Sequence, residues 1–597
     1  MSRTVRTACT LTVAAAMAVP AAAAASAQPV AESGGGGPGK TAVAKGYGGA
    51  VATVDLDATR AGIEVLRRGG NAVDAAVAAA AALGVTEPYS AGVGGGGFFV
   101  YYDARTGKVA TIDGRETAPA AMTATSFTEN GAAIPFAEGV TSGLGVGVPG
   151  TPATWEKALK QWGTISLGTA LRPATRLAEK GFVVDETFKQ QTQDNAARFS
   201  AFPATRDLFL PGGQAPAVGT VLKNPDLAAS YRAMAAKGAS AIYSGSIAGD
   251  IVTTVQKPPK DPSSTLNVRP GLMTAKDLAT YTAPTRRPTR TDYRGLAVYS
   301  MAPPSSGGTT VGEALNILET AKLGKLDRTQ AMHRYLEASG ISFADRNLYV
   351  GDPAFGKVPV QQLLSDSFAK QRACLIKADS TLARPIAAGD PYKRGSGCAA
   401  GGTRSAGGHE GLSTTHLTTA DKWGNVVSYT LTIEQTGGSG IVVPGRGFLL
   451  NNELTDFNFT DTQNGHDPNL PGPGKRPRSS MAPTIVLKDG KPVLALGSPG
   501  GATIITTVLQ TLVNRLDLGM TLPAAVAAPR ASDRNGAAAD AEPGFDTGGL
   551  TELGHKFATV SEIGAVAAIE FGPGRTMQAV AEPTRRGGGS AMVVTSK

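Results

Sequence analysis

Two segments near the start of the chain place apolar residues at the spacing of an α-helix. Residues 56–68 have this spacing and stop at Gly69 and Gly70, so the pattern predicts a helix that ends at the glycine pair. Asn71 follows as an N-cap residue, and a second helix is predicted from it through Leu83. Because this second segment consists mostly of small residues, we expect it to pack closely against neighbouring elements.

Other segments are rich in β-branched and aromatic residues, which is typical of strands. In residues 425–434 a period of two separates an apolar face from a face that carries two hydroxyls and a carboxylate. The first face holds Leu431 and Ile433, and the second holds Thr430, Thr432 and Glu434. The predicted strands are residues 98–102, 109–112, 414–419, 425–434, 484–487 and 492–496, whereas helical patterns prevail from residue 151 to about 357, with a break at the proline-rich loop 257–270.

A glycine-rich turn separates the last of these strands from a predicted helix over residues 502–518. The turn reads Gly497-Ser498-Pro499-Gly500-Gly501, and a strand, turn and helix start of this kind present unpaired backbone N–H groups. Neither Gly-Lys-Ser/Thr nor the GxGxxG spacing is present, so phosphate-binding and dinucleotide-binding loops are weak explanations. The N–H groups would suit an oxyanion hole, and the alternative is a tight turn without a chemical role.

The composition is that of a globular protein. The 597 residues are 42% hydrophobic and 18% charged, which argues against disorder. The net charge of +9 comes from scattered cations, and we interpret it as a solvated surface rather than a nucleic-acid site. The five histidines show no HExxH pattern and the cysteines no CxxC pattern, so we expect neither a metal site nor a cofactor.

The first 27 residues have the pattern of a secretory signal peptide. Arg3 and Arg6 precede an apolar run over residues 8–19, and Ala25-Ser26-Ala27 provides a cleavage site. No later segment is long and apolar enough to span a membrane, so we expect an exported, soluble protein, extracellular or periplasmic. In an oxidising compartment Cys374 and Cys398 could close a disulfide loop, and two free thiols are the alternative.

Thr414 lies where the character of the sequence changes. Residues 394–413 are almost all Gly, Ala, Ser and charged residues, which indicates a linker, and a strand is predicted to begin at Thr414. Cleavage of the bond between Ser413 and Thr414 would free an α-amine with a pKa of about 8, which can accept the proton of the hydroxyl on the same residue. No Gly-x-Ser-x-Gly elbow offers a serine nucleophile instead. The alternative is that Thr414 is an ordinary strand threonine.

Seven short motifs follow one another from about residue 45 to beyond 530. They are Glu87-Pro88 with Gly94 to Gly97, Arg115-Glu116, Thr414-Thr415-His416, Asp421-Lys422 with Gly424-Asn425, Asn451 to Phe457, Lys475 to Met481, and Gly497 to Gly501. Together they resemble the γ-glutamyltransferase family, whose members are also called glutathione hydrolases.

The resemblance implies an α+β fold, the four-layer αββα sandwich of N-terminal nucleophile hydrolases, and a proenzyme that cuts itself between Ser413 and Thr414. The products would be a large chain of residues 28–413 and a small chain of residues 414–597, associated as a heterodimer. By position, Thr414 is implied to be the nucleophile and Thr432 its supporting hydroxyl. The other implied residues are the oxyanion-hole amides Gly500 and Gly501, the substrate-carboxylate contacts Arg115, Ser479 and Ser480, and the substrate-ammonium contacts Glu434, Glu453 and Asp456.

The separation into carboxylate contacts and ammonium contacts agrees with the chemistry of a γ-glutamyl group, which ends in a zwitterion. Its carboxylate needs cationic and hydroxyl donors, and its ammonium needs carboxylates. The implied substrates are glutathione and other γ-glutamyl compounds, with water, amino acids or peptides as acceptors of the acyl group.

Two features depart from the family pattern. Many members have Asn where Glu434 stands, and residues 457–474 look shortened where some members carry a lid, with no aromatic residue after Phe459. A short lid would favour hydrolysis or larger γ-glutamyl donors.

Two other functions compete with this interpretation. One is a related acylase that prefers glutaryl or cephalosporin-type side chains, and the other is a non-catalytic secreted binding protein with the same fold. The three carboxylates argue against the acylase, because a glutaryl group has no ammonium. Retention of Thr414, Thr432 and both glycines argues against the binding protein.

Overall fold

The largest sheet of the computed structural model doubles back to form two stacked layers. The structure describes residues 39–393, 397–398, 411 and 413–596, so the predicted signal peptide and most of the predicted linker lie outside the described residues. The first layer runs in the order β8 (Thr285–Arg286), β3 (Lys108–Gly114), β2 (Gly96–Asp103), β12 (Val426–Thr432), β11 (Thr415–Asp421), β1 (Val43–Thr53) and β20 (Ser590–Ser596). The second layer continues from β1 through β19 (Met577–Ala581), β18 (Ala567–Phe571), β14 (Lys491–Gly497), β13 (Thr484–Lys488), β10 (Leu296–Ser300) and β9 (Thr289–Tyr293).

Strand β1 is the place where the two layers diverge. One edge of β1 pairs with β19 over residues 43–46 and with β11 over residues 49–52, while β20 pairs along the other edge. Gly48 lies between the two pairings and Gly49 begins the second, with φ of 83° and 138°, a backbone region that residues with a side chain rarely adopt. The glycines therefore let one strand serve both layers.

Hydrogen bonds and apolar side chains hold the layers face to face. Ser428 on β12 donates to the Leu496 carbonyl on β14 at 3.0 Å, and Thr418 on β11 donates to the Ala567 carbonyl on β18 at 3.0 Å. Phe98 and Val100 of β2 belong to the same buried cluster as the second layer, whereas their neighbour Phe99 faces the opposite way. This alternation is the period of two expected for a strand that is buried on both faces.

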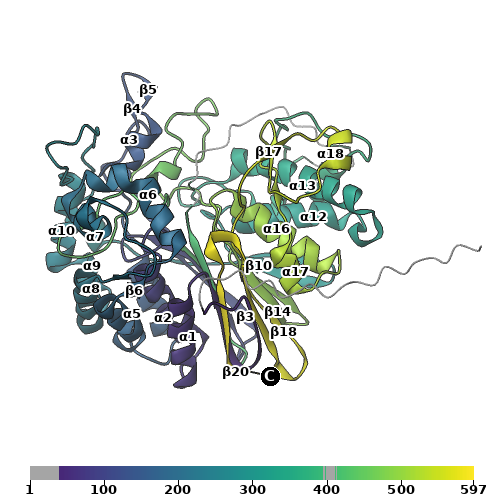
Figure 1. Cartoon of the computed structure of the whole chain (residues 1–597). Coiled ribbons are helices and arrows are strands. Elements are labelled where there is room, and N and C mark those ends of the chain that lie inside the picture. The colour runs from purple at the N-terminus through teal and green to yellow at the C-terminus, as the bar shows by residue number, and fades with distance from the viewer. Residues whose placement is uncertain (1–38, 394–396, 399–410, 412, 597) are drawn as a thin grey trace, which may run out of the picture. The chain divides into compact units, whose positions relative to one another are not determined.

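Helices cover both outer faces of the doubled sheet, as Figure 1 shows. On the first layer lie α1 (Leu56–Arg67), α2 (Ala72–Thr86), α5 (Leu167–Lys180) and α8 (Pro225–Lys237), and on the second lie α12 (Gly307–Glu319), α13 (Arg328–Tyr349) and α16 (Thr503–Leu516). The predicted four-layer αββα architecture is confirmed.

The remaining elements are shorter or peripheral. They are α3 (Phe136–Val140), α4 (Thr151–Trp162), α6 (Glu186–Ser200), α7 (Pro203–Phe209), α9 (Ser240–Tyr243), α10 (Gly245–Gln256), α11 (Ala275–Ala279), α14 (Val360–Leu363), α15 (Asp366–Ala373), α17 (Leu522–Ala527) and α18 (Gly548–Glu552), with strands β4 (Thr128–Glu129), β5 (Ala132–Ala133), β6 (Phe182–Val183), β7 (Val221–Leu222), β15 (Ala531–Ser532), β16 (Ala539–Ala541) and β17 (Phe557–Thr559). None of the helices in the described part of the chain combines the length and apolar character needed to cross a membrane.

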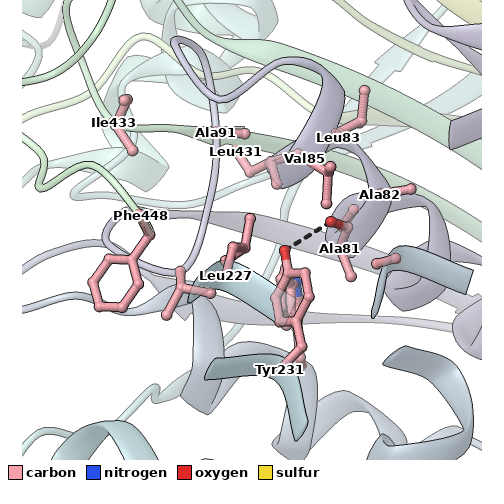
Figure 2. Close-up of a cluster of buried hydrophobic side chains, with 14 of the residues drawn as sticks. Ala81, Ala82, Leu83, Val85, Ala91, Leu227, Tyr231, Leu431, Ile433 and Phe448 are labelled. Atoms are coloured by element: carbon pink, nitrogen blue, oxygen red, sulfur yellow. Dashed lines mark hydrogen bonds between the residues drawn. The ribbon is translucent and has the colours of Figure 1, made fainter. Parts of the chain in front are cut away.

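Helix α2 is buried along its whole length because its residues are small. Asn71 caps it and forms a capping box with Asp74, as a strong helix start requires. Gly84 faces Tyr231 of α8, and a methyl group placed on this glycine would lie 2.8 Å from the Tyr231 hydroxyl. That hydroxyl donates to the Ala81 carbonyl at 2.8 Å, which Figure 2 shows among the surrounding apolar side chains.

The predicted elements agree with the structure for both early helices and all six strands, but two differences appear. The region of helical patterns also contains the strands β6 to β10, and β9 alternates buried and exposed residues from Thr289 to Tyr293. The predicted strand 425–434 ends at Thr432, and Glu434 has a φ of 81°, so strand alternation does not orient its side chain. Of the two alternatives for the cysteines, the structure has the disulfide between Cys374 and Cys398, with their Cα atoms 5.6 Å apart.

Candidate active site

Thr414 lies directly before β11, at the end of the first sheet layer. The antiparallel register pairs Thr415 with Leu431, which places Thr414 opposite Thr432 at the end of β12. Thr414 is buried, and its hydroxyl donates to the Thr432 hydroxyl at 3.3 Å and also contacts the carbonyl oxygen of Ser413. The nucleophile predicted from the sequence therefore lies against the peptide group that would be cut.

A group that the sequence analysis missed holds the peptide groups around Thr414. Arg586, in the loop before β20, donates to the Thr414 carbonyl at 2.6 Å and to the Ser90 hydroxyl at 2.8 Å. Ser413 in turn contacts the Ser90 hydroxyl at 3.0 Å and the Tyr89 carbonyl at 3.1 Å. The only sequence signal was the neighbouring Glu87-Pro88 motif, since Glu87 pairs with Arg586 at 3.8 Å.

The histidine nearest in sequence to Thr414 is not available as its base. His416 is buried between the layers, and its ring nitrogens contact the Thr430 hydroxyl at 2.8 Å and the Thr418 hydroxyl at 3.0 Å. Burial lowers the pKa of His416 to about 3, so the ring is neutral at physiological pH. An α-amine on Thr414 would fill the role of base instead.

The glycine turn joins β14 to α16 beside the nucleophile. Gly500 and Gly501 have φ of 131° and 55°, and both precede the helix, so their N–H groups lie outside its own hydrogen-bond ladder. Gly501 lines the same pocket as Thr414 and Thr432. The turn has the form expected of an oxyanion hole.

Arg115 and two carboxylates form a buried ion-pair cluster in this pocket. The Arg115 guanidinium contacts Glu453 and Asp456, which belong to the short 3-10 helix η3 (Glu453–Asp456). It also donates to the carbonyls of Pro477 at 3.1 Å and Arg478 at 2.9 Å, so most of its N–H groups are already used. One oxygen of Glu453, Oε2, has no hydrogen-bond partner among the described residues and could accept from a substrate.

Glu434 lies in the same pocket, where its surroundings favour the neutral form. Burial, and next the charge of Asp456, raise the pKa of Glu434 well above its usual range. Its carboxyl group accepts from the backbone N–H of Gly411 and from the side chain of Asn452. The expected repulsion between crowded carboxylates contributes to the raised pKa of Glu434, but the loss of hydration on burial contributes more.

The two serines line the opposite wall of the pocket. Ser480 accepts from Arg346 of α13 at 2.8 Å, and Ser479 accepts from the Met481 N–H at 3.2 Å. Arg346 and Asn452 are further contacts that the sequence analysis did not single out. The residues around the pocket are Arg115, Gly411, Ser413, Thr414, Thr432, Glu434, Glu453, Asp456, Ser479, Ser480, Met481, Gly501 and Ile504.

Two neighbours stabilise the frame of the pocket without lining it. The Asn451 side chain bonds to Gly147 and Gly94, which ties the glycine-rich loop before β2 to η3. In residues 457–474, Asn458 bonds Asp467 at 2.7 Å and Phe459 stacks on Phe127 at 4.3 Å. This segment therefore packs against the protein body.

Comparison with known proteins agrees with this geometry. The family model described as gamma-glutamyltranspeptidase matches residues 58–592. The chain is 43% identical over 558 residues to a glutathione hydrolase proenzyme of Bacillus subtilis (strain 168), covering 91% of each. It is 36% identical over 549 residues to the acylase ACY 1 proenzyme of Pseudomonas sp. (strain SE83), covering 90% of this chain and 92% of the relative.

A solved structure is similar over nearly the same length. The crystal structure of cephalosporin acylase from Bacillus halodurans superposes with a TM-score of 0.81 at 29% identity, covering 94% of this chain and 98% of that one. The matches extend across both outer helical layers and the sheet between them. From the family model and the curated relatives, the chain belongs to the gamma-glutamyltranspeptidase family.

Proposed function

We propose that this protein is an exported γ-glutamyltransferase and glutathione hydrolase that matures by cutting itself between Ser413 and Thr414. The observation that carries the proposal is the position of the Thr414 hydroxyl, which lies between the Ser413 carbonyl group and the Thr432 hydroxyl. The export step rests on the signal-peptide pattern of residues 1–27.

Maturation proceeds through an ester. The Thr414 Oγ1 attacks the Ser413 carbonyl carbon, the peptide C–N bond breaks, and the Thr414 nitrogen takes up the proton to become the α-amine. Water then hydrolyses the ester, releasing the Ser413 carboxyl group and restoring the Thr414 hydroxyl. Arg586 and Ser90 support this step because they hold the Thr414 carbonyl and the Ser413 side chain, on the two sides of the reacting bond.

The mature enzyme repeats the same chemistry on its substrate. The Thr414 α-amine accepts the hydroxyl proton while Oγ1 attacks the γ-carbonyl carbon, and the amides of Gly500 and Gly501 stabilise the resulting oxyanion. The amine proton passes to the leaving group as the γ-glutamyl ester forms. Water or the amino group of an acceptor then attacks the ester and frees Thr414.

Recognition of the donor depends on the charged pocket. The substrate α-carboxylate would lie near Arg115 and the hydroxyls of Ser479 and Ser480. The α-ammonium would lie near the carboxylates of Glu434, Glu453 and Asp456. In the uncut chain the Gly411 N–H already bonds Glu434, so the segment before Thr414 has to leave before a donor can bind.

Two measurements test the proposal directly. Purified wild-type protein should give a fragment that begins Thr-Thr-His, whereas Thr414→Ala should remain full length. Wild type should release nitroaniline from γ-glutamyl-p-nitroanilide, and faster when glycylglycine is present as an acceptor. A Thr414→Ala protein that still splits would falsify the assignment of the nucleophile.

A second candidate is an acylase for glutaryl or cephalosporin-type donors. The observation that favours it is the similarity to proteins named acylase and cephalosporin acylase. The discriminating experiment compares kcat/KM for γ-glutamyl- and glutaryl-p-nitroanilide on wild-type protein. A preference for the glutaryl donor would replace the leading proposal with this one.

A further inference from the structure

A buried cluster of two histidines and a glutamate lies outside the active site, against the second helical layer. His333 and Glu337 are four residues apart on α13, so they share one face of the helix, and His555 comes from the loop after α18. One side-chain atom from each lies within 4.8 Å of the other two, and all three residues are buried. Neither the proposed maturation nor the proposed acyl transfer uses these groups.

The hydrogen bonds of His333 prepare its ring to bind a cation. Its Nε2 lies 2.7 Å from the Lys377 carbonyl oxygen, which can only accept, so Nε2 carries a proton. Its Nδ1 forms a hydrogen bond with His555 Nε2 at 2.8 Å, so one of these two nitrogens carries a proton, and a metal ion between the rings would take the place of that proton. A histidine whose second nitrogen donates to a backbone carbonyl is the usual arrangement of a metal ligand.

His555 and Glu337 supply the other donor atoms. His555 Nε2 would bind the ion through a lone pair with the ring proton on Nδ1, the other tautomer of the imidazole, once the ion replaces the hydrogen bond to His333. Glu337 accepts from Arg384 at 2.8 Å through one oxygen and from the Leu382 N–H at 3.1 Å through the other. Because each carboxylate oxygen has two acceptor positions, both contacts leave room for a metal ion.

The local charge also favours a cation. Arg384 bonds both Glu337 and Asp533, at 2.8 Å and 2.7 Å, so a single guanidinium is shared between two carboxylates. One cationic group and two anionic groups give this ion-paired set one net negative charge. A divalent ion would compensate that charge inside a buried site.

We propose that His333, Glu337 and His555 bind a divalent transition-metal ion, with Zn²⁺ as the ion whose ligand preferences fit best. Two imidazole nitrogens and one carboxylate oxygen are typical zinc ligands, and a water molecule would complete a tetrahedron. Calcium and magnesium fit poorly because they prefer oxygen ligands. The sequence analysis expected no metal site because neither an HExxH nor a CxxC pattern is present. The fold, and not a local pattern, brings His555 to His333 across 222 residues.

The ion would also join the two products of maturation. His333 and Glu337 belong to the large chain and His555 to the small chain, so a bound ion would connect them through metal–ligand bonds. This second part rests on the proposed cleavage between Ser413 and Thr414, whereas the binding site itself does not.

Zinc binding is therefore measured first on uncut Thr414→Ala protein that has been stripped with EDTA and dialysed. We expect one Zn²⁺ per chain, and absorption bands of tetrahedral cobalt when Co²⁺ is added instead. Adding His555→Gln or His333→Gln should weaken Zn²⁺ binding at least tenfold. Adding His466→Gln, which removes an exposed histidine elsewhere, should leave the affinity unchanged.

Three results would overturn the site: no stoichiometric Zn²⁺ binding, equal binding by all four proteins, or a Co²⁺ spectrum without tetrahedral bands. Far-UV circular dichroism of each variant without metal checks that the fold is kept. The bridging role is tested on cleaved protein, where Zn²⁺ should raise the urea concentration that separates the chains in wild type but not in His555→Gln. If that concentration does not change although Zn²⁺ binds, the bridging role is wrong and the site stands.

Discussion

Arg115 is the residue on which the largest number of pocket contacts converge. It contacts two carboxylates and two backbone carbonyls, and a lysine ammonium cannot reach all four. We expect Arg115→Lys to cut itself normally but to lose roughly 10- to 100-fold in kcat/KM for γ-glutamyl-p-nitroanilide, as expected for lost hydrogen bonds between charged groups. Gel analysis of cleavage provides the control. Full activity in a processed variant would remove Arg115 from donor recognition.

Glu434 gives the pocket a dependence on pH. Its raised pKa favours the neutral form in the empty pocket, whereas an arriving ammonium favours the ionised form. The KM for a γ-glutamyl donor should therefore fall as pH rises through the Glu434 pKa, up to the pH at which the donor's own amine loses its proton.

Replacing Glu434 by Gln tests this role. The variant keeps the shape of the side chain and cannot ionise, so the fall in KM with pH should disappear and the preference for γ-glutamyl over glutaryl donors should drop roughly tenfold. Cleavage at Thr414 should persist. An unchanged donor ratio in Glu434→Gln would exclude contact with the ammonium.

Glu116 makes folding stability depend on pH for a different reason. Its carboxylate oxygens have no hydrogen-bond partner among the described residues, and burial raises its pKa from 4.5 to about 8. Between these values the folded chain keeps a proton that the unfolded chain has lost. The stabilisation present below pH 4.5 is therefore lost as pH rises toward 8, by about 1.4 kcal/mol per pH unit.

The variant Glu116→Gln removes this titration. In the uncut Thr414→Ala background, urea unfolding at several pH values should show wild-type stability falling relative to Glu116→Gln between pH 5 and 8, by a few kcal/mol in total. The difference between the two proteins, rather than either absolute value, is the quantity to measure. A difference that is constant with pH would show that Glu116 does not titrate in this range.

At the scale of single elements, the close packing of α2 can be tested with one methyl group. Gly84→Ala would place Cβ 2.8 Å from the Tyr231 hydroxyl and 3.3 Å from the Gly92 Cα, in a region without free space. We expect a loss of about 1–3 kcal/mol in the free energy of unfolding, typical of overpacking.

A matched control lies in α10. Gly249 is also inside a helix, but a Cβ there would meet no atom within 4 Å. Gly249→Ala should therefore be neutral or stabilise by about 0.5–1 kcal/mol through helix propensity. Equal effects of the two substitutions in thermal or urea unfolding would contradict the packing argument for α2.

Local sequence patterns predicted helices and strands well where the local signal favours the same structure as the tertiary environment. Helices α1 and α2 and strands β2, β11 and β12 were expected within a few residues, because their caps, glycine stops and alternation are local signals. Strand β1 was not expected, since its glycines lower strand propensity and are needed only because β1 joins two layers. β18 to β20 were also missed.

The residues of the candidate pocket also fall into two groups, those that the sequence reveals and those that only the fold reveals. Thr414, Arg115, Glu453 and Asp456 lie within short motifs, whereas Thr432 and Glu434 were assigned by position from the family resemblance. The structure brings all six into one pocket. Arg586 and Arg346 lie far from those motifs in sequence, so only tertiary packing reveals that they contact Thr414 and Ser480. The burial that raises the pKa of Glu434 likewise depends on the whole fold.

At the scale of the whole molecule, the two proposed chains are interleaved in the sheet. β11 and β12 of the small chain lie between β1 and β2 of the large chain, and β19 pairs with β1. Separating the chains would break these hydrogen bonds and expose both layers. We therefore expect cleaved protein to elute as one species in size-exclusion chromatography and to separate only with denaturant; a folded, isolated chain in native buffer would contradict this.

The contact between Arg586 and the Thr414 carbonyl has a consequence for the order of events during synthesis. Arg586 lies 172 residues after Thr414 and is followed by β20, which pairs with β1. A nascent chain that already contains Thr414 therefore lacks this arginine until those residues have been translated. Self-cleavage would then wait for the synthesis of Arg586, and a product truncated before Arg586 would remain in one piece.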